Sequence, residues 1–324
     1  MRGRRTRRIV RQEGVAIVTA LLLTTLAITI VASLFWQQQV QVRSIENQRL
    51  QLQKQWILRG ALDWTRLILR EDARLSSVDN LDEPWAVPLA ETRLDQYVEN
   101  ARNGSDVPDA TLSGGIVDAE SRFNITNLCQ GGTVNPVEVA AFARLLSGAQ
   151  QNPSLAQATA ELMASAQSGA ANNASAGDAS AMGDTAGSAR SLGIRQAEDL
   201  LAVPGFTPAA LAAIRDFIVV LPVVTPINVN TASAEVLAAR IDTLSLSDAT
   251  ALVAARQSAW FRDINDFTQR MGGKALSSGA GEVAVSTGYF LVNGQVRLDR
   301  AGMNMQALIE RSGLNTRVVW IRED

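Results

Sequence analysis

Residues 15–36 form an uncharged, largely apolar run of 22 residues, VAIVTALLLTTLAITIVASLFW. A helix needs about 20 such residues to cross the hydrocarbon core of a bilayer, so this run predicts a transmembrane helix. Six arginines precede it within residues 1–14, and the aromatic pair Phe35 and Trp36 closes its far end. The positive-inside rule and the interfacial preference of aromatic side chains therefore predict a cytoplasmic N-terminus, with everything after Trp36 on the opposite side of the membrane.

The run differs from a secretory signal peptide, whose apolar core spans about 7–15 residues and ends in an A-x-A-like cleavage site. It continues into residues 37–74, which contain no proline and carry charges of both signs. Apolar residues recur there near helical spacing, which predicts a stem helix over residues 37–82 that continues the transmembrane helix. The recurring residues are Ile45, Leu52, Trp56, Leu62 and Ile68.

Composition argues against an enzyme. The chain has no histidine, which removes the commonest general base and metal ligand, and its single cysteine, Cys129, excludes an intramolecular disulfide and a thiolate zinc site. Cys129 is predicted to be a small buried hydrophobe, with intermolecular pairing as the alternative. The carboxylate pairs Asp82-Glu83 and Asp118/Glu120 have no evident acid–base partner, so we expect no catalytic residues.

Charge is unevenly distributed. The formal net charge is −2, but residues 1–14 carry +5, which leaves −7 for the remainder. A basic head on an acidic body suits orientation in a membrane better than binding of nucleic acid.

The N-terminus resembles the precursors of type IV pilins and pseudopilins, in which a short basic leader ends in glycine just before an apolar helix. The resemblance implies that a prepilin peptidase cleaves between Gly14 and Val15 and that Val15 is then methylated. The alternative is a plain membrane anchor with an arginine-rich tail.

The fifth residue after that cleavage site is Thr19, where pilins usually carry glutamate. A charged side chain in the membrane costs about 2.5–3.5 kcal/mol unless it is paired. In this family the glutamate is thought to pair with the terminal amine of the next subunit toward the tip. A tip subunit has no such neighbour, so a neutral residue suits it. The K-type minor pseudopilin of type II secretion systems typically lacks this glutamate, although a single threonine is also compatible with an ordinary helix position.

The rest of the chain resembles the same K-type family. Residues 110–128 read as strand, turn and strand, and contain a pattern similar to that of the family, with Ser121 where the family often has glycine. Its asparagines are expected to bond local backbone and to tolerate left-handed geometry. The residues that match the pattern are Asp118, Arg122, Phe123, Asn124, Asn127 and Leu128.

The resemblance implies an α+β fold in which the long N-terminal helix packs on an antiparallel pilin-like sheet with an inserted helical domain. The first part of the sheet is expected in residues 83–135, the insert in 136–271 and the C-terminal strands in 272–324. Within the insert, residues 137–147 predict a helix, and the Ala/Ser/Gly-rich stretch 148–193 predicts a flexible loop. In the last part, Asn293-Gly294 predicts a hairpin turn between two strands, and residues 303–311 and 317–322 predict two more strands.

Residues 194–221 and 227–267 resemble helix-hairpin-helix modules, which occur in periplasmic DNA receptors of competence systems. A membrane-anchored DNA-binding protein is therefore the alternative function. DNA-binding hairpins use a glycine-rich turn to approach phosphate, but the second module has Thr243–Ser247 at that turn, without glycine. Basic residues are also sparse and interleaved with acids, so we expect no nucleic-acid partner.

The K-type resemblance implies a single-pass protein of the bacterial inner membrane, with its bulk in the periplasm, at the tip of a short pseudopilus. It implies I- and J-type minor pseudopilins and a prepilin peptidase as partners, with the H-type and the major pseudopilin as further ones. No cofactor is expected. Calcium is the one exception left open, because the family includes calcium-binding members. Here the matching region offers only Asp178 and Asp184, and no ligand is assigned.

Overall fold

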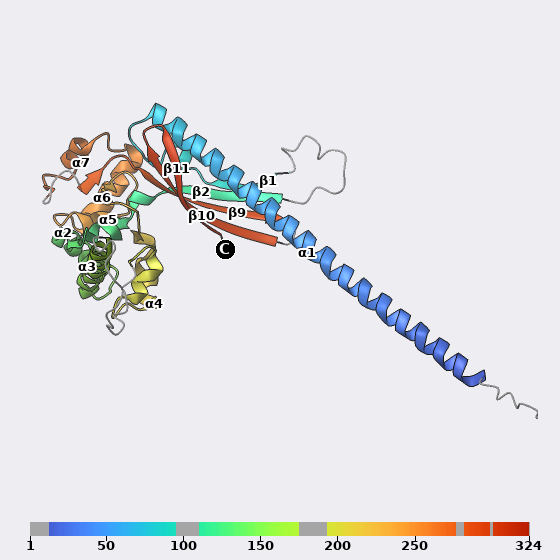
Figure 1. Cartoon of the computed structure of the whole chain (residues 1–324). Coiled ribbons are helices and arrows are strands. Elements are labelled where there is room, and N and C mark those ends of the chain that lie inside the picture. Colours follow the sequence, from blue (N-terminus) through green and yellow to red (C-terminus); the bar gives the residue numbers. More distant parts are fainter. Residues whose placement is uncertain (1–12, 95–109, 175–192, 277–281, 299–300, 324) are drawn as a thin grey trace, which may run out of the picture. The chain divides into compact units, whose positions relative to one another are not determined.

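The computed structural model describes residues 13–94, 110–174, 193–276, 282–298 and 301–323 (Figure 1). The chain divides into two compact units, Met1–Ile57 and Leu58–Asp324. Helix α1 (Glu13–Leu75) supplies the described part of the first unit, and its last turns, from Leu58 onward, belong to the second.

In the first unit, the predicted transmembrane segment is helical, and its side chains from Ala16 to Trp36 are exposed. Among the described residues, α1 is the one helix long and apolar enough to cross a membrane, with an 18-residue window of mean hydropathy 2.4. Its threonines do not leave unpaired hydroxyls, because Thr24, Thr25 and Thr29 each donate to a carbonyl oxygen three or four residues earlier, over 2.8–3.1 Å. Such internal bonds are what a lipid environment demands of polar groups.

The second unit contains a five-stranded antiparallel sheet with the strand order β1-β2-β9-β10-β11. One face of the sheet packs against the part of α1 that follows Ile57, where Leu58, Leu62 and Leu69 are buried (Figure 1). This arrangement confirms the predicted α+β fold with its long N-terminal helix on an antiparallel sheet. The strands are β1 (Leu89–Arg93), β2 (Ala110–Asp118), β9 (Tyr289–Leu298), β10 (Ala301–Ser312) and β11 (Asn315–Glu323).

Asn293-Gly294 forms no hairpin turn, so this prediction was wrong. Both residues lie inside β9, which is paired along its length with β2 on one side and β10 on the other. A β-carbon on Gly294 would lie 3.3 Å from Cδ2 of Leu58, so glycine lets α1 approach the sheet at this point. The strands predicted at residues 303–311 and 317–322 are confirmed as β10 and β11.

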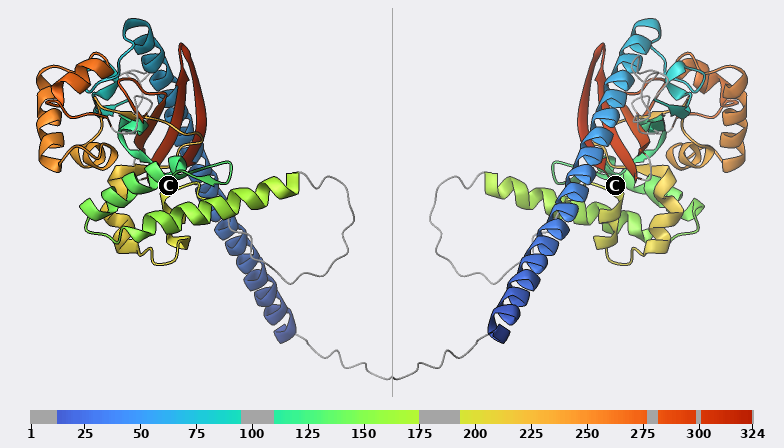
Figure 2. Two further views of the ribbon diagram at one scale, coloured as in Figure 1. Left: turned by 90° about the vertical axis from the view of Figure 1, so that its left-hand side faces the viewer. Right: turned by 90° about the vertical axis from the view of Figure 1, so that its right-hand side faces the viewer.

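Between β2 and β9 lies a helical insert, whose helices gather at one end of the sheet (Figure 2). Three two-stranded ladders pair β3 with β6, β4 with β5 and β7 with β8. The helices are α2 (Pro136–Gly148), α3 (Ser154–Ala174), α4 (Pro208–Ile214), α5 (Ala234–Arg240), α6 (Leu246–Ser258) and α7 (Ile264–Arg270). The short strands are β3 (Phe123–Asn124), β4 (Cys129–Gln130), β5 (Thr133–Val134), β6 (Ile218–Val219), β7 (Ile227–Asn228) and β8 (Val283–Ala284), and the 3-10 helices are η1 (Pro84–Ala86), η4 (Ala119–Ser121), η5 (Ile125–Leu128), η6 (Ala197–Ala202) and η7 (Arg215–Phe217).

The insert begins earlier than the predicted boundary at residue 136. Phe123 and Leu128 are buried in the core of the insert, and the Phe123 ring stacks on that of Phe142 in α2 with 5.4 Å between centroids. Cys129 is also buried there as a free thiol, as predicted for a small hydrophobe. The helix predicted at residues 137–147 is confirmed as α2.

Two further predictions were wrong. The flexible loop 148–193 contains helix α3, because its few large apolar side chains, including Leu155 and Met163, pack into the core of the insert. The later part of that loop, 175–192, lies outside the described residues. The stem helix ends at Leu75 rather than at residue 82, where Ser76 Oγ both donates to the Val78 carbonyl (2.7 Å) and accepts from the Val78 amide (3.1 Å).

Candidate functional site

The predicted processing residues lie in the first turns of α1. Gly14 and Val15 belong to the helix, and Thr19 donates from Oγ1 to the carbonyl oxygen of Ala16 over 3.0 Å. Thr19 is thus a neutral side chain compatible with the apolar face of the helix. Cleavage after Gly14 and methylation of Val15 stay predictions.

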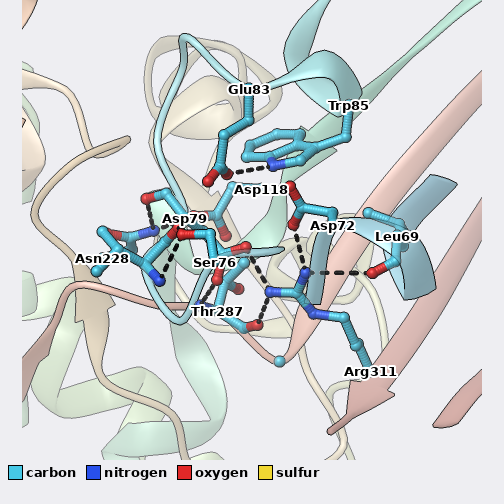
Figure 3. Close-up of polar contacts among 12 residues, drawn as sticks. Leu69, Asp72, Ser76, Asp79, Glu83, Trp85, Asp118, Asn228, Thr287 and Arg311 are labelled. Carbon is cyan, nitrogen blue, oxygen red and sulfur yellow. Dashed lines mark hydrogen bonds and ion pairs between the residues drawn. The ribbon is translucent and has the colours of Figure 1, made fainter. Parts of the chain in front are cut away.

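The most extensive polar arrangement among the described residues is a buried network where α1, the sheet and the insert meet (Figure 3). Its centre is Arg311 at the end of β10, whose side chain is 8% exposed. Its Nη1 donates to Oδ2 of Asp72 on α1 over 2.8 Å, and its Nη2 forms an ion pair with Asp79. The guanidinium also lies 4.6 Å from the ring centroid of Phe290. Arg311 therefore compensates two buried carboxylates and stacks on an aromatic face.

Asp79 extends the network to the insert. Its Oδ2 accepts from the amide of Thr287 over 2.7 Å, and its carbonyl oxygen accepts from Nδ2 of Asn228 over 3.0 Å. Asn228, on β7, is fully buried and also donates to Oδ2 of Asp118 at the end of β2 over 2.9 Å. One amide thus links the loop after α1, the sheet and the insert (Figure 3).

Asp118 and Glu120 are two carboxylates at this junction. Asp118 accepts hydrogen bonds from Thr231 Oγ1 over 2.6 Å and from the amide of Glu120 over 2.7 Å, and the second of these bonds caps η4. Glu120 Oε1 accepts from the amide of Gly288 over 3.0 Å. Burial raises the pKa of Asp118 to about 6. Burial, together with the nearby charge of Asp118, raises the pKa of Glu120 to about 8. Through these hydrogen bonds, Asp118 and Glu120 connect the end of β2 to the insert and to the segment just before β9.

The asparagines of the family-like pattern bond backbone both nearby and far along the chain, so the predicted bonding to local backbone is confirmed for Asn124. Asn124 Oδ1 accepts from the amides of Thr126 and Leu221, both over 3.1 Å, and its Nδ2 donates to the carbonyl oxygen of Val223 over 2.8 Å. Asn127 exchanges two bonds with the backbone of Thr225, over 2.8 and 3.1 Å. Asn124 has φ −83°, so the expected left-handed geometry was wrong. These two side chains bind residues 221–225, which follow β6, to residues 124–127.

A second buried ionic link lies inside the insert. Arg240 on α5 donates from Nη1 to Oε2 of Glu138 on α2 over 2.5 Å and lies 3.2 Å from Oε2 of Glu282. The Arg240 side chain is 3% exposed. It fixes two helices and the segment before β8 to one another.

The residues present do not fit calcium at the network. Oxygen atoms of Asp72, Asp79 and Glu83 lie within 4.8 Å of one another, but Arg311 already donates to Asp72 and Asp79. Glu83 accepts from Trp85 Nε1 over 2.7 Å. Calcium takes about six to eight oxygen ligands, whereas a guanidinium supplies the positive charge here. Asp178 and Asp184 lie outside the described residues.

Sequence reasoning missed most of this network. Asp79 and Arg311 are 232 positions apart and Asn228 and Asp118 are 110 apart, so no local spacing relates them. The one available signal was Asn228 itself, a polar residue in the apolar-flanked run INVN that opens the second helical module. Thr231, three residues further along, donates to Asp118, and Ser233 is the N-cap of α5.

The sequence matches a family of known proteins. Residues 121–223 and 227–287 match two domains described as type II secretion system (T2SS), protein K. The chain is 30% identical over 305 residues to type II secretion system protein K of Pseudomonas aeruginosa, covering 89% of this chain and 85% of the relative.

The fold is also similar to a chain in the crystal structure of the GspK-GspI-GspJ complex from the enterotoxigenic Escherichia coli type 2 secretion system. The TM-score is 0.62 and the identity 17%, with 87% of this chain and 99% of the solved chain covered. This likeness supports the fold, and the sequence matches carry the family. The chain belongs to the type II secretion system protein K family.

Proposed function

We propose that this protein is a minor pseudopilin that occupies the tip of the type II secretion pseudopilus and helps to start its assembly. It is anchored in the bacterial inner membrane by the first part of α1, with the unit Leu58–Asp324 in the periplasm. It acts by associating with other subunits, and it does not chemically modify the proteins that the secretion system exports.

The observation that carries the proposal is the uncharged segment 16–36 of α1, in which threonine hydroxyls bond carbonyl groups of the same helix and apolar side chains are exposed. Such a surface is stable in lipid or against other apolar helices. The basic leader and the site Gly14–Val15 lie immediately before it. Family membership and this anchor together support a pilin-like subunit.

Thr19 supports a position at the tip. A subunit with no neighbour ahead of it gains nothing from a carboxylate at this depth, which would cost about 2.5–3.5 kcal/mol if unpaired. Threonine avoids that cost, because its hydroxyl bonds its own helix.

The solved relative was crystallised with GspI and GspJ. We propose the I- and J-type minor pseudopilins of the same system as partners of this chain, with the H-type and the major pseudopilin below them. A prepilin peptidase acts on the precursor.

Mass spectrometry of the native protein tests the anchor. We expect a mature chain that begins at a methylated Val15. A chain that retains residues 1–14 with an unmodified Val15 would reduce the assignment to a generic anchored domain.

Thr19→Glu tests the tip position, with Thr24→Ser as a matched control in the same helix. We expect the Glu variant to impair initiation, seen as fewer or displaced pseudopili and reduced export, while the control behaves as wild type. Unchanged initiation and subunit position in the Glu variant would contradict the tip role.

DNA binding is tested by an electrophoretic shift assay on the full chain in detergent. Asp248 lies in the first turn of α6, directly after the turn of the second module, where its carboxylate accepts from the amide of Ser245 and pairs with Lys274. A carboxylate there repels phosphate, so we expect no shift. A clear, salt-dependent shift would favour the DNA-receptor alternative.

A further inference from the structure

A polar cleft lies between the insert and the face of the sheet that points away from α1. It consists of two adjoining hollows with volumes of about 630 and 100 Å³. Both are lined by the η6 end of the insert, by Arg215, and by Gln306 and Arg322 of the sheet. The network of Asp72, Asp79 and Arg311 does not contribute to the lining of either hollow.

Strand register explains why this face is polar. Gln306 on β10 lies opposite Asn293 on β9 and opposite Arg322 on β11, so the three side chains share one face. Two positions along, the same face turns apolar, because Leu308 and Leu291 pack with Val219 of the insert. The sheet is therefore covered by the insert at one end and leaves a polar surface open at the other.

Amide side chains dominate the wall formed by the sheet. Gln306 Nε2 donates to Oδ1 of Asn293 over 3.1 Å, and Gln295 and Asn304 lie beside them on the neighbouring positions of β9 and β10. Each primary amide both donates and accepts hydrogen bonds. Such a row matches the alternating N–H and C=O groups of an extended polypeptide.

Four arginines line the narrower hollow, and Glu198 is the one carboxylate in its lining. Glu198 pairs with Arg215 over 2.5 Å. None of the ion pairs found among the described residues involves Arg122, Arg195 or Arg322. Arg322 instead covers the Trp320 ring, at 4.2 Å from its centroid. The hollow thus presents excess positive charge inside a body whose net charge is −7.

Arg122 is the most informative of these residues. Burial lowers the pKa of its guanidinium, and the charge of Asp216 only partly opposes this effect. Burial of this cation therefore outweighs the favourable charge of Asp216, and an anionic group entering the hollow would relieve the remaining cost.

We propose that this cleft binds an extended, acidic peptide segment of a protein partner, with carboxylates on the arginines and peptide groups on the amides. This inference rests on the proposed function in one respect: it assumes that the ligand is a segment of a protein, because the proposed function is association with other protein subunits. A bound segment would lie along the polar face of β9–β11 with its acidic side chains toward Arg122 and Arg322.

Fluorescence anisotropy with the full chain in detergent micelles tests the proposal. The probe is a labelled peptide of about eight residues rich in Asp and Glu, long enough to span the cleft at about 3.3 Å per residue. The comparison peptide replaces each acid by its amide. We expect the acidic peptide to bind at least about tenfold more tightly, with an affinity that falls as salt is added.

Arg122→Gln and Arg322→Gln should each weaken binding of the acidic peptide about tenfold, the effect of losing one charge-assisted hydrogen bond. Arg297→Gln is the matched control, because Arg297 is exposed on β9 and lies outside the lining. It should leave binding unchanged. Thermal unfolding curves establish that all three variants are folded.

Equal binding of the acidic and amide peptides, or an equal loss in Arg297→Gln, would overturn the proposal. Tighter binding of a single-stranded oligonucleotide of the same charge would also overturn it, in favour of nucleic acid. These outcomes do not bear on the proposed function, because cleavage after Gly14 and pseudopilus assembly are measured independently of Arg122 and Arg322.

Discussion

Arg311 at the end of β10 and Asp72 on α1 form a buried ion pair, with 2.8 Å between Nη1 and Oδ2, although 239 positions separate them. The same guanidinium pairs with Asp79 in the loop that follows α1. The last strands of the chain are thereby fastened to the end of its first helix. These ion pairs fix the end of α1 to the sheet within the unit Leu58–Asp324.

Arg311→Ala should lower the free energy of unfolding by about 3–5 kcal/mol, because it leaves two buried carboxylates without their cation. Urea denaturation of the full chain in detergent measures the change. Arg317→Ala is the control: its ion pair with Glu310 lies at the surface, with the Arg317 side chain 72% exposed, and should contribute less than about 1 kcal/mol. Equal losses in both variants would contradict a central role for Arg311.

Asn228→Ala should loosen the attachment of the insert to the sheet. The variant removes three buried hydrogen bonds, those donated to Asp79 O and Asp118 Oδ2 and the one accepted from the amide of Asn230, and should cost about 1–3 kcal/mol. Limited proteolysis would show faster cleavage between the sheet and the insert. Asn304→Ala, on an exposed position of β10, should leave the cleavage rate unchanged. Identical proteolysis of both variants and wild type would remove Asn228 from the junction.

Stability should fall as pH rises through the pKa values of the buried carboxylates. Burial raises the pKa of Glu120 from 4.5 to about 8 and that of Asp118 from 3.8 to about 6. The folded state therefore binds more protons than the unfolded state between these values, so the slope of unfolding free energy against pH is negative there.

Glu120→Gln keeps an oxygen for the amide of Gly288 but removes the titration. Melting temperatures measured from about pH 5 to pH 9 should decline less in this variant than in wild type, and the variant should be the more stable protein at the alkaline end. Glu235→Gln, on α5, is the control and should follow the wild-type curve. Parallel curves for Glu120→Gln and wild type would show that Glu120 does not titrate in this range.

Two glycines should respond to alanine in opposite directions. A β-carbon on Gly114 in β2 would overlap the carbonyl oxygen of Asn293 and lie 3.1 Å from Cα of Gly294, so Gly114→Ala should cost about 1–3 kcal/mol. Gly60 in α1 has no atom within 4 Å of that position, and Gly60→Ala should stabilise the helix by up to about 1 kcal/mol. Thermal unfolding of both variants checks the signs, and a stabilised Gly114→Ala protein would contradict the close strand contact.

The sequence alone was sufficient for the features that depend on neighbours in the chain. The length and apolar character of residues 15–36 predict a helix able to cross a membrane, and the structure contains a helix of that length and hydropathy there. Helical periodicity likewise predicted that α1 continues beyond the apolar run, and the helix at residues 137–147 and the strands at 303–311 and 317–322 were predicted from the sequence.

Only the tertiary structure decided the rest. Asn293-Gly294 has the local chemistry of a turn, but pairing with β2 and β10 on both sides makes it the middle of a strand. Arg311, Asp79 and Asn228 carry no local signal, and they meet only because the sheet closes over α1 while the insert docks at its end. The free energy of such contacts comes from burial and from pairing between residues more than a hundred positions apart. No local stretch of the sequence contains both partners, so local patterns cannot predict these contacts.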